Sequence, residues 1–246
     1  MRRLFAPVTG LLALLLTGCF DFTEEVWVHQ DQTARIAWTW GFDERDLGPD
    51  QVEEFKQTFE EAARELAAGE GVTRAESRYA LRDGLHQYTV DASLASYRHL
   101  ESVASSARGA MTRQGVALSG AGSAYRFEEL EGGRMRWVRS LAPEGAELRK
   151  AGPMAQELAR KRGGEPRQHR VTFRFNAPRI DAAEHATASG RRSAEWSYAF
   201  DDDAVPSALT ADFRFAPAVP WTLVLGGAAA MAGFVWLRRK WNRRWE

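Results

Sequence analysis

The chain has 246 residues, of which 44% are hydrophobic and 27% charged, and its formal net charge at pH 7 is zero. This composition is typical of a folded globular protein and excludes a disordered chain. A single cysteine excludes disulfides within the chain and metal sites built from several thiolates.

The zero net charge hides an asymmetry between the termini and the rest of the chain. Once Arg2, Arg3 and the charged residues of 238–246 are set aside, residues 4–237 contain 26 basic and 32 acidic side chains. Non-specific binding of nucleic acid requires a basic face. We therefore expect no nucleic-acid partner.

The N-terminus has the features of a bacterial lipoprotein signal. Two arginines precede an apolar run over 11–16, which ends in Leu16-Thr17-Gly18-Cys19. A basic start, an apolar core and small residues before the cleavage site make up an export signal. The pattern predicts a signal peptide over 1–18 and lipidation of Cys19, which becomes the first residue of the mature chain. The alternative is an ordinary secretory signal with an incidental cysteine.

Apolar alternation predicts two strands at the start of the exported part, over 20–29 and 33–42, with a turn at 30–32. Gly48-Pro49-Asp50 then opens an amphipathic helix that ends at Gly69. Asp50 and Glu53 suit a capping box. The apolar stripe of this helix consists of Val52, Phe55, Phe59, Ala62 and Leu66.

A second hairpin is predicted over 72–80 and 85–90, because Asp83-Gly84 is a strong turn signal. A second amphipathic helix follows, with Leu94, Tyr97, Leu100, Ala104 and Ala107 on one side. A third hairpin is expected over 125–130 and 135–141, and further strands over 171–175, 194–200 and 209–215. The segment 142–167 breaks the pattern and is interpreted as a basic surface insert.

The stretch 219–237 has no charged residue and is long enough, at roughly 28 Å, to cross a bilayer as a helix. Trp221 and Trp236 suit the two interfaces, and Arg238, Arg239 and Lys240 open a basic tail over 238–246 that predicts a cytoplasmic C-terminus. A small-residue face of Gly226, Ala230 and Gly233 suits a partner helix. The alternative is a buried core helix.

Together these patterns predict an α+β fold: a curved antiparallel sheet packed on two amphipathic helices, plus one C-terminal transmembrane helix. The expected organisation is a signal peptide (1–18), an extracytoplasmic domain (19–218), the span (219–237) and the tail (238–246). Both ends of the domain are then expected at the inner membrane of a bacterium.

Three stretches are similar to bacterial LppM-type lipoproteins. They are the lipobox that leads directly into the hairpin FTEEVWVHQDQTA, the region 171–200 with Asn176-Ala177-Pro178 and Glu195-Trp196, and the single C-terminal span with a basic tail. The resemblance implies an extracytoplasmic α+β domain between a lipid anchor and a membrane helix. It also implies a lipid or glycolipid ligand, which has been proposed for some members.

No catalytic or metal-binding motif is present, so we expect no enzyme, cofactor or metal. The five histidines lack metal-ligand spacing; they are His29, His86, His99, His169 and His185. Neighbouring carboxylates in a strand, such as Glu24 and Glu25, point to opposite faces and cannot converge. The triple aspartate at 201–203 lacks the alternating spacing of a calcium loop.

The sequence favours a membrane-anchored, non-enzymatic binding domain for lipid or envelope components. The alternative is a structural or regulatory subunit of a membrane assembly. Two surfaces are candidates for the ligand. Basic residues of the insert suit anionic lipid headgroups, or are simply solvated; they are Arg149, Lys150, Arg160, Lys161 and Arg162. The abundant tryptophans suit an apolar ligand inside a curved sheet, or a large core.

Overall fold

The computed structural model describes residues 20–104, 125–141, 170–199, 205–215 and 231. The chain divides into two units, Met1–Phe215 and Ala216–Glu246, and every element named below belongs to the first.

Most elements of the described residues are strands, and one long helix and a short 3-10 helix lie among them. In chain order they are β1 (Phe20–Val28), β2 (Ala34–Asp43), α2 (Pro49–Ala67), β3 (Val72–Arg82), β4 (Leu85–Leu94), η1 (Tyr97–His99), β5 (Tyr125–Leu130), β6 (Arg134–Ser140), β7 (Arg170–Asn176), β8 (Arg179–Glu184), β9 (Ala188–Ser189), β10 (Ser193–Ala199) and β11 (Ala208–Arg214).

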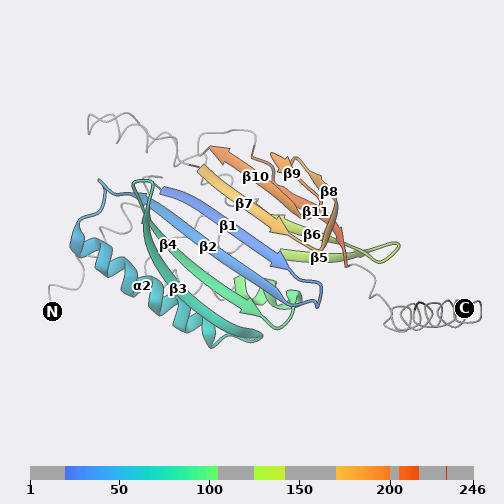
Figure 1. Ribbon diagram of the computed structural model, residues 1–246, viewed down its shortest axis with the longest axis horizontal. Helices are drawn as coiled ribbons and strands as arrows, with labels where there is room; N and C mark the ends of the chain where they lie inside the picture. Colours follow the sequence, from blue (N-terminus) through green and yellow to red (C-terminus); the bar gives the residue numbers. More distant parts are fainter. Residues whose placement is uncertain (1–19, 105–124, 142–169, 200–204, 216–230, 232–246) are drawn as a thin grey trace, which may run out of the picture. The chain divides into compact units, whose positions relative to one another are not determined.

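Within the described residues the strands form two sheets (Figure 1). The larger has seven strands in the order β3-β4-β2-β1-β7-β10-β9, and the smaller has four in the order β5-β6-β11-β8. Strand β1 lies in the middle of the larger sheet, antiparallel to β2 and parallel to β7. The last third of the chain crosses between the sheets, because β7 and β10 belong to the larger and β8 and β11 to the smaller.

The predicted hairpins are confirmed, and their turns explain their register. Gln32 has φ 68° in the β1–β2 turn, and Asp83 and Gly84 have φ values of 53° and 71° between β3 and β4. Two successive residues with positive φ form the type I′ geometry that matches the twist of a two-residue hairpin. Phe20 is paired with Phe42, so β1 is paired from its first residue.

The inner face of the large sheet is covered by two different layers. Helix α2 covers β3, β4 and β2. There Phe55 packs edge-on against Phe42 at 5.2 Å, and Phe59 stacks on Tyr88 at 5.1 Å. The small sheet covers β7 and β10, where Trp137 stacks on Phe175 at 4.6 Å between ring centroids. One continuous core therefore lies between the large sheet and both of its covers.

Helix α2 forms where the apolar stripe predicts it, and Phe55, Phe59, Ala62 and Leu66 are buried. Its start differs from the prediction. The N-cap is Gly48, Pro49 occupies the first turn, and the side chain of Gln51 accepts a hydrogen bond from the Gly48 N–H at 2.9 Å. Proline suits the first turn because its missing N–H has no partner there in any helix.

The predicted fold class is wrong. The described residues form a mainly β structure of two facing sheets, with one parallel strand pair, rather than one antiparallel sheet on two helices. Strands β8 and β9 were not predicted, because 179–189 shows little alternation. Leu94 belongs to β4, where it pairs with Ala34, so the second helical segment begins only at η1 and is described to residue 104.

The predicted transmembrane helix is not supported either. In the part of the chain that the structure describes, no helix is both long and apolar enough to cross a bilayer. Apart from Met231, the stretch 219–237 lies outside that part.

A buried ion pair joins the two sheets. Arg139 of β6 donates to Glu24 of β1 through Nε at 2.5 Å and through Nη2 at 3.0 Å. The Trp38 indole also donates to Glu24, at 3.3 Å, and the Arg139 guanidinium lies 4.2 Å from the centre of the Phe173 ring. Both charged side chains are almost fully buried. Bidentate pairing and the added indole bond offset the cost of removing these charges from water.

The domain has its two described chain ends at opposite ends of β1. The chain enters the sheet at Phe20, and β1 extends roughly 26 Å from there to Val28. Beyond that end, the Tyr97 N–H donates to the Gln32 carbonyl at 2.9 Å, and the Tyr97 ring lies 5.8 Å from the Phe215 ring. Phe215, where the description of the domain ends, therefore lies beside the far end of β1.

Removing one partner of the buried pair is expected to destabilise the protein strongly. Arg139→Met leaves the Glu24 carboxylate buried without its cation, so we expect the free energy of unfolding to fall by about 3–5 kcal/mol. Urea denaturation of the full chain in mild detergent, followed by circular dichroism, measures it. The double variant Glu24→Leu/Arg139→Met removes both charges and should lose clearly less. A single variant as stable as the parent would contradict this role.

Candidate functional site

The aromatic residues of the inner faces pack against one another. Besides its stack on Phe175, Trp137 lies 5.7 Å from Trp196, and Trp40 lies 5.0 Å from Phe59. Trp38, Trp40, Trp137 and Trp196 are essentially inaccessible to solvent. Contacts of this kind are those of a large core, which favours that interpretation of the tryptophans over an apolar ligand inside the sheet.

The other face of the large sheet, here called the outer face, is polar and carries a row of hydroxyl side chains. Five adjacent strands contribute one hydroxyl residue each at the same level. In the order of the strands they are Thr89, Thr39, Thr23, Thr172 and Ser197. The hydroxyls of Thr39 and Thr89 lie 2.9 Å apart, and those of Thr172 and Ser197 lie 3.2 Å apart. At about 4.8 Å per strand, this hydroxyl row extends roughly 19 Å.

A charged cluster on β3, β4 and β2 borders the hydroxyl row at one end. Asp91 of β4 accepts from Arg35 Nε at 2.8 Å and from Arg78 Nη2 at 3.0 Å. The hydrogen bond to Asp91 raises the pKa of Arg35 above its usual value. The Asp91 side chain is 6% exposed, whereas those of Arg35 and Arg78 are 37% and 57% exposed. The buried carboxylate thus holds two guanidinium groups at the surface.

A second charged cluster borders the row on the other strands. Arg174 of β7 donates to Glu195 of β10 at 2.6 Å, and its Nη1 lies 3.9 Å from Glu25 of β1. The Asn176 amide also donates to Glu25, at 3.0 Å. Arg170, at the start of β7, donates to the Ser197 hydroxyl at 3.1 Å.

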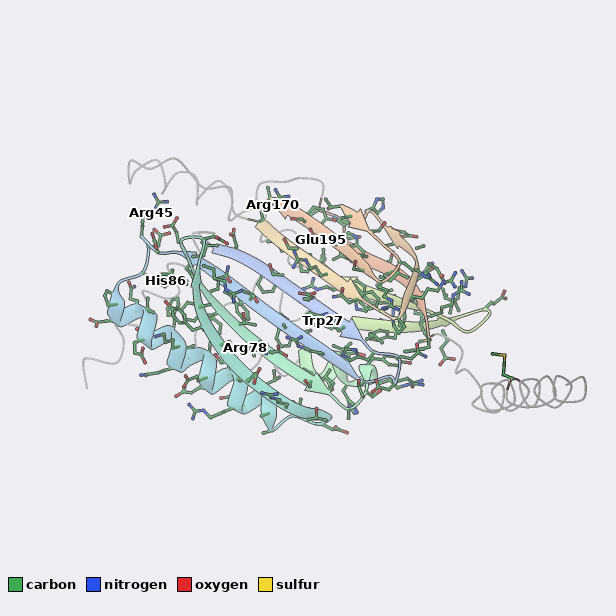
Figure 2. All side chains as sticks on the ribbon, viewed as in Figure 1. Trp27, Arg45, Arg78, His86, Arg170 and Glu195 are labelled. Carbon is green, nitrogen blue, oxygen red and sulfur yellow. The ribbon has the colours of Figure 1, made fainter. Side chains whose placement is uncertain are left out.

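Trp27 is the one tryptophan of the described residues that is not buried, and it lies on the outer face near the end of β1 (Figure 2). The guanidinium carbon of Arg35 lies 4.3 Å from the centre of its ring. Cation–π stacking and the bonds to Asp91 hold this arginine from two sides. The indole is therefore fixed in orientation beside the two charged clusters.

The outer face combines an oriented aromatic ring, fixed hydroxyls and paired charges on a rigid sheet. Such a surface can stack a flat or ring-shaped polar ligand on Trp27 while side chains exchange hydrogen bonds with its hydroxyl groups. The geometry offers hydrogen bonding and ring stacking to a ligand.

The residues predicted from sequence as site residues lie outside the described part of the chain. They are the lipidated Cys19; the span and tail residues Trp221, Trp236, Arg238, Arg239 and Lys240; the small residues Gly226, Ala230 and Gly233; and the basic residues Arg149, Lys150, Arg160, Lys161 and Arg162. These assignments stay predictions.

Among the described residues, no group of three or more histidine, cysteine or acidic side chains could hold a metal ion. His86 Nδ1 lies 2.9 Å from the Tyr79 hydroxyl. His99 packs so closely on Gly71 that a Cβ there would lie 2.2 Å from its ring. The prediction for the Glu24–Glu25 pair is confirmed: Glu24 is buried, and Glu25 lies on the outer face.

Sequence reasoning missed the hydroxyl row. Alternation places Thr172 on the other face of its strand from Val171 and Phe173. It likewise places Trp27 on the other face from Val26 and Val28. Each strand by itself therefore indicates which of its residues point outward. The alignment of five such positions depends on the register between strands that are up to 149 residues apart, and no local pattern contains that register.

No known protein family matches the sequence, and no curated protein matches it. Among solved structures, the chain is similar to the folded domain of LppM from Mycobacterium tuberculosis, determined by NMR. The TM-score is 0.46 and the sequence identity 10%, over 81% of this chain and 92% of that domain. The likeness concerns the course of the chain alone.

Proposed function

We propose that this protein is an exported lipoprotein whose domain binds a hydroxyl-rich component of the cell envelope on its outer face, without catalysing a reaction. Lipid on Cys19 would hold the domain at the bacterial inner membrane. The ligand class is a glycan or the sugar headgroup of a glycolipid.

The observation that carries this proposal is the position of Trp27 on the same face as the hydroxyl row. A sugar ring presents apolar C–H groups on its faces and hydroxyl groups around its edge. An indole face can stack on the C–H groups, and threonine, serine, arginine and carboxylate side chains can form hydrogen bonds with the hydroxyl groups. Because these groups already bond to one another, little side-chain freedom would be lost on binding.

The packed core supports the same choice of ligand. The contacts between Trp137, Phe175 and Trp196 leave the inner faces occupied by the protein's own rings. A sugar bound on the outer face would need no rearrangement of these contacts, whereas an acyl chain between the sheets would have to displace them.

Removing the aromatic face is expected to weaken binding to the envelope glycan. We expect Trp27→Ala to reduce the affinity of the full chain for purified cell-wall polysaccharide on the order of tenfold, because stacking and the position of Arg35 are both lost. Co-sedimentation at several polysaccharide concentrations measures it. Trp27→Phe should retain much of the affinity.

Glu60→Gln is the matched control, since Glu60 is exposed on α2, which covers the opposite face. Thr172→Val keeps the shape of the side chain and removes one hydroxyl, and should cost about three- to tenfold. Unchanged affinity in both Trp27→Ala and Thr172→Val would contradict the proposed site.

The choice between a sugar and an acyl ligand can be tested directly. We expect native mass spectrometry of the full chain, released from mild detergent, to show the covalent lipid of Cys19 and no second, non-covalent lipid that lacks a sugar headgroup at stoichiometric amounts. A retained diacyl lipid without a sugar headgroup would show that the core binds acyl chains and would overturn the choice of a sugar.

A further inference from the structure

We infer that the domain stands upright on the membrane, with the end of the large sheet where β1 begins in contact with the lipid headgroups. The inference rests on the proposed lipidation of Cys19. It names the surface of the domain that meets the bilayer, here called the proximal end: Asp21, residues 43–50, residues 81–84 and Arg170.

The first step is the absence of a linker between the lipid and the sheet. Cys19 directly precedes Phe20 in the sequence, and Phe20 is the first residue of β1. Phe20 is already paired with Phe42. Strand β1 is held on both sides, by β2 and by β7. A lipid on Cys19 therefore brings the end of a central strand, and not a flexible arm, to the headgroup region.

The second step is the set of segments that surround this end of β1. The Glu44 N–H donates to the Gly84 carbonyl at 2.9 Å, which joins the loop after β2 to the β3–β4 turn. The Arg170 N–H donates to the Asp21 carboxylate at 3.1 Å. Figure 2 shows Arg45, His86 and Arg170 near this end of the sheet, with Trp27 near the other. These segments form the rim that must face the bilayer.

The third step concerns the chemistry of the proximal end. Leu81 is 53% exposed and is the most exposed large hydrophobic residue of the described domain. A leucine at the headgroup level would bury apolar surface that water otherwise covers. The charged residues of this end are mainly acidic: Asp21, Asp43, Glu44, Asp46, Asp50 and Asp83 against Arg45, Arg82 and Arg170. The lipid tether, and not attraction to anionic lipid, therefore holds it at the surface.

An upright domain sets the height of the proposed binding surface. Thr23 is four residues from Cys19 and Trp27 eight, so the hydroxyl row and the indole would lie roughly 13 Å and 26 Å above the anchor. Phe215 would lie at the far end as well. The outer face would then be open to glycan that lies beyond the headgroups.

Fluorescence quenching can test the orientation with single-cysteine reporters, because the native thiol of Cys19 is blocked by its lipid. Arg82→Cys labels the proximal end, and Glu131→Cys labels the β5–β6 turn at the opposite end. Arg78→Cys labels the edge strand β3 at the level of the hydroxyl row, since Arg78 pairs with Thr89. Each full chain is labelled with a small fluorophore and reconstituted in phosphatidylcholine vesicles that contain a headgroup nitroxide lipid.

We expect quenching at residue 82 to exceed that at residue 131 several-fold, with residue 78 between them. Replacing part of the phosphatidylcholine with phosphatidylglycerol should lower the quenching at residue 82, since like charges repel. Equal quenching at 78 and 82 would mean that the domain lies on its outer face, and strongest quenching at 131 would mean that it is inverted. Either result overturns the inference.

Flotation of the same vesicles separates this inference from the proposed anchor. If the parent chain floats with the vesicles and Cys19→Ser does not, the lipid anchor is present, and the quenching pattern then tests orientation alone. If both float or neither does, lipid on Cys19 is not what holds the chain at the vesicle, and the upright inference loses its premise.

Discussion

The buried pair of Glu24 and Arg139 is the interaction on which the arrangement of the two sheets depends. It is the point where a central strand of the large sheet and a strand of the small sheet exchange charge-assisted hydrogen bonds inside the core. The aromatic stack of Trp137 on Phe175 would tolerate some sliding, because dispersion is not directional. A bidentate pair in an apolar surrounding tolerates little, so it fixes how the sheets face each other.

Strand β1 connects this core to the rest of the molecule. Its inward residues, Phe22, Glu24 and Val26, are buried, and its outward residues, Thr23, Glu25 and Trp27, belong to the proposed binding face. Its first residue follows the predicted lipid attachment site. One strand would therefore connect the proposed lipid anchor to the core and to the outer face, and a shift of its register by one residue would exchange the two faces.

The outer face illustrates how ordinary residues can form a surface with a defined chemistry. Threonine and serine are common on exposed strands, and a single one of them does not indicate a binding site. Pairing of five strands places their hydroxyls in one row, and the buried carboxylate of Asp91 fixes two arginines beside it. On unpaired segments the same polar residues would have no fixed positions relative to one another. Strand pairing offsets the conformational entropy that is lost when they are ordered.

The sequence by itself determined the hairpins, the long helix and the faces of their residues, because alternation, the helical stripe and turn residues such as Asp83-Gly84 act locally. It also determined that Glu24 and Glu25 diverge. Only the tertiary structure decided the parallel pairing of β1 with β7, the separate small sheet, the partner of Glu24 and the hydroxyl row. Each of these joins residues far apart in the chain, such as Glu24 and Arg139, 115 positions apart, and no local pattern encodes such a contact.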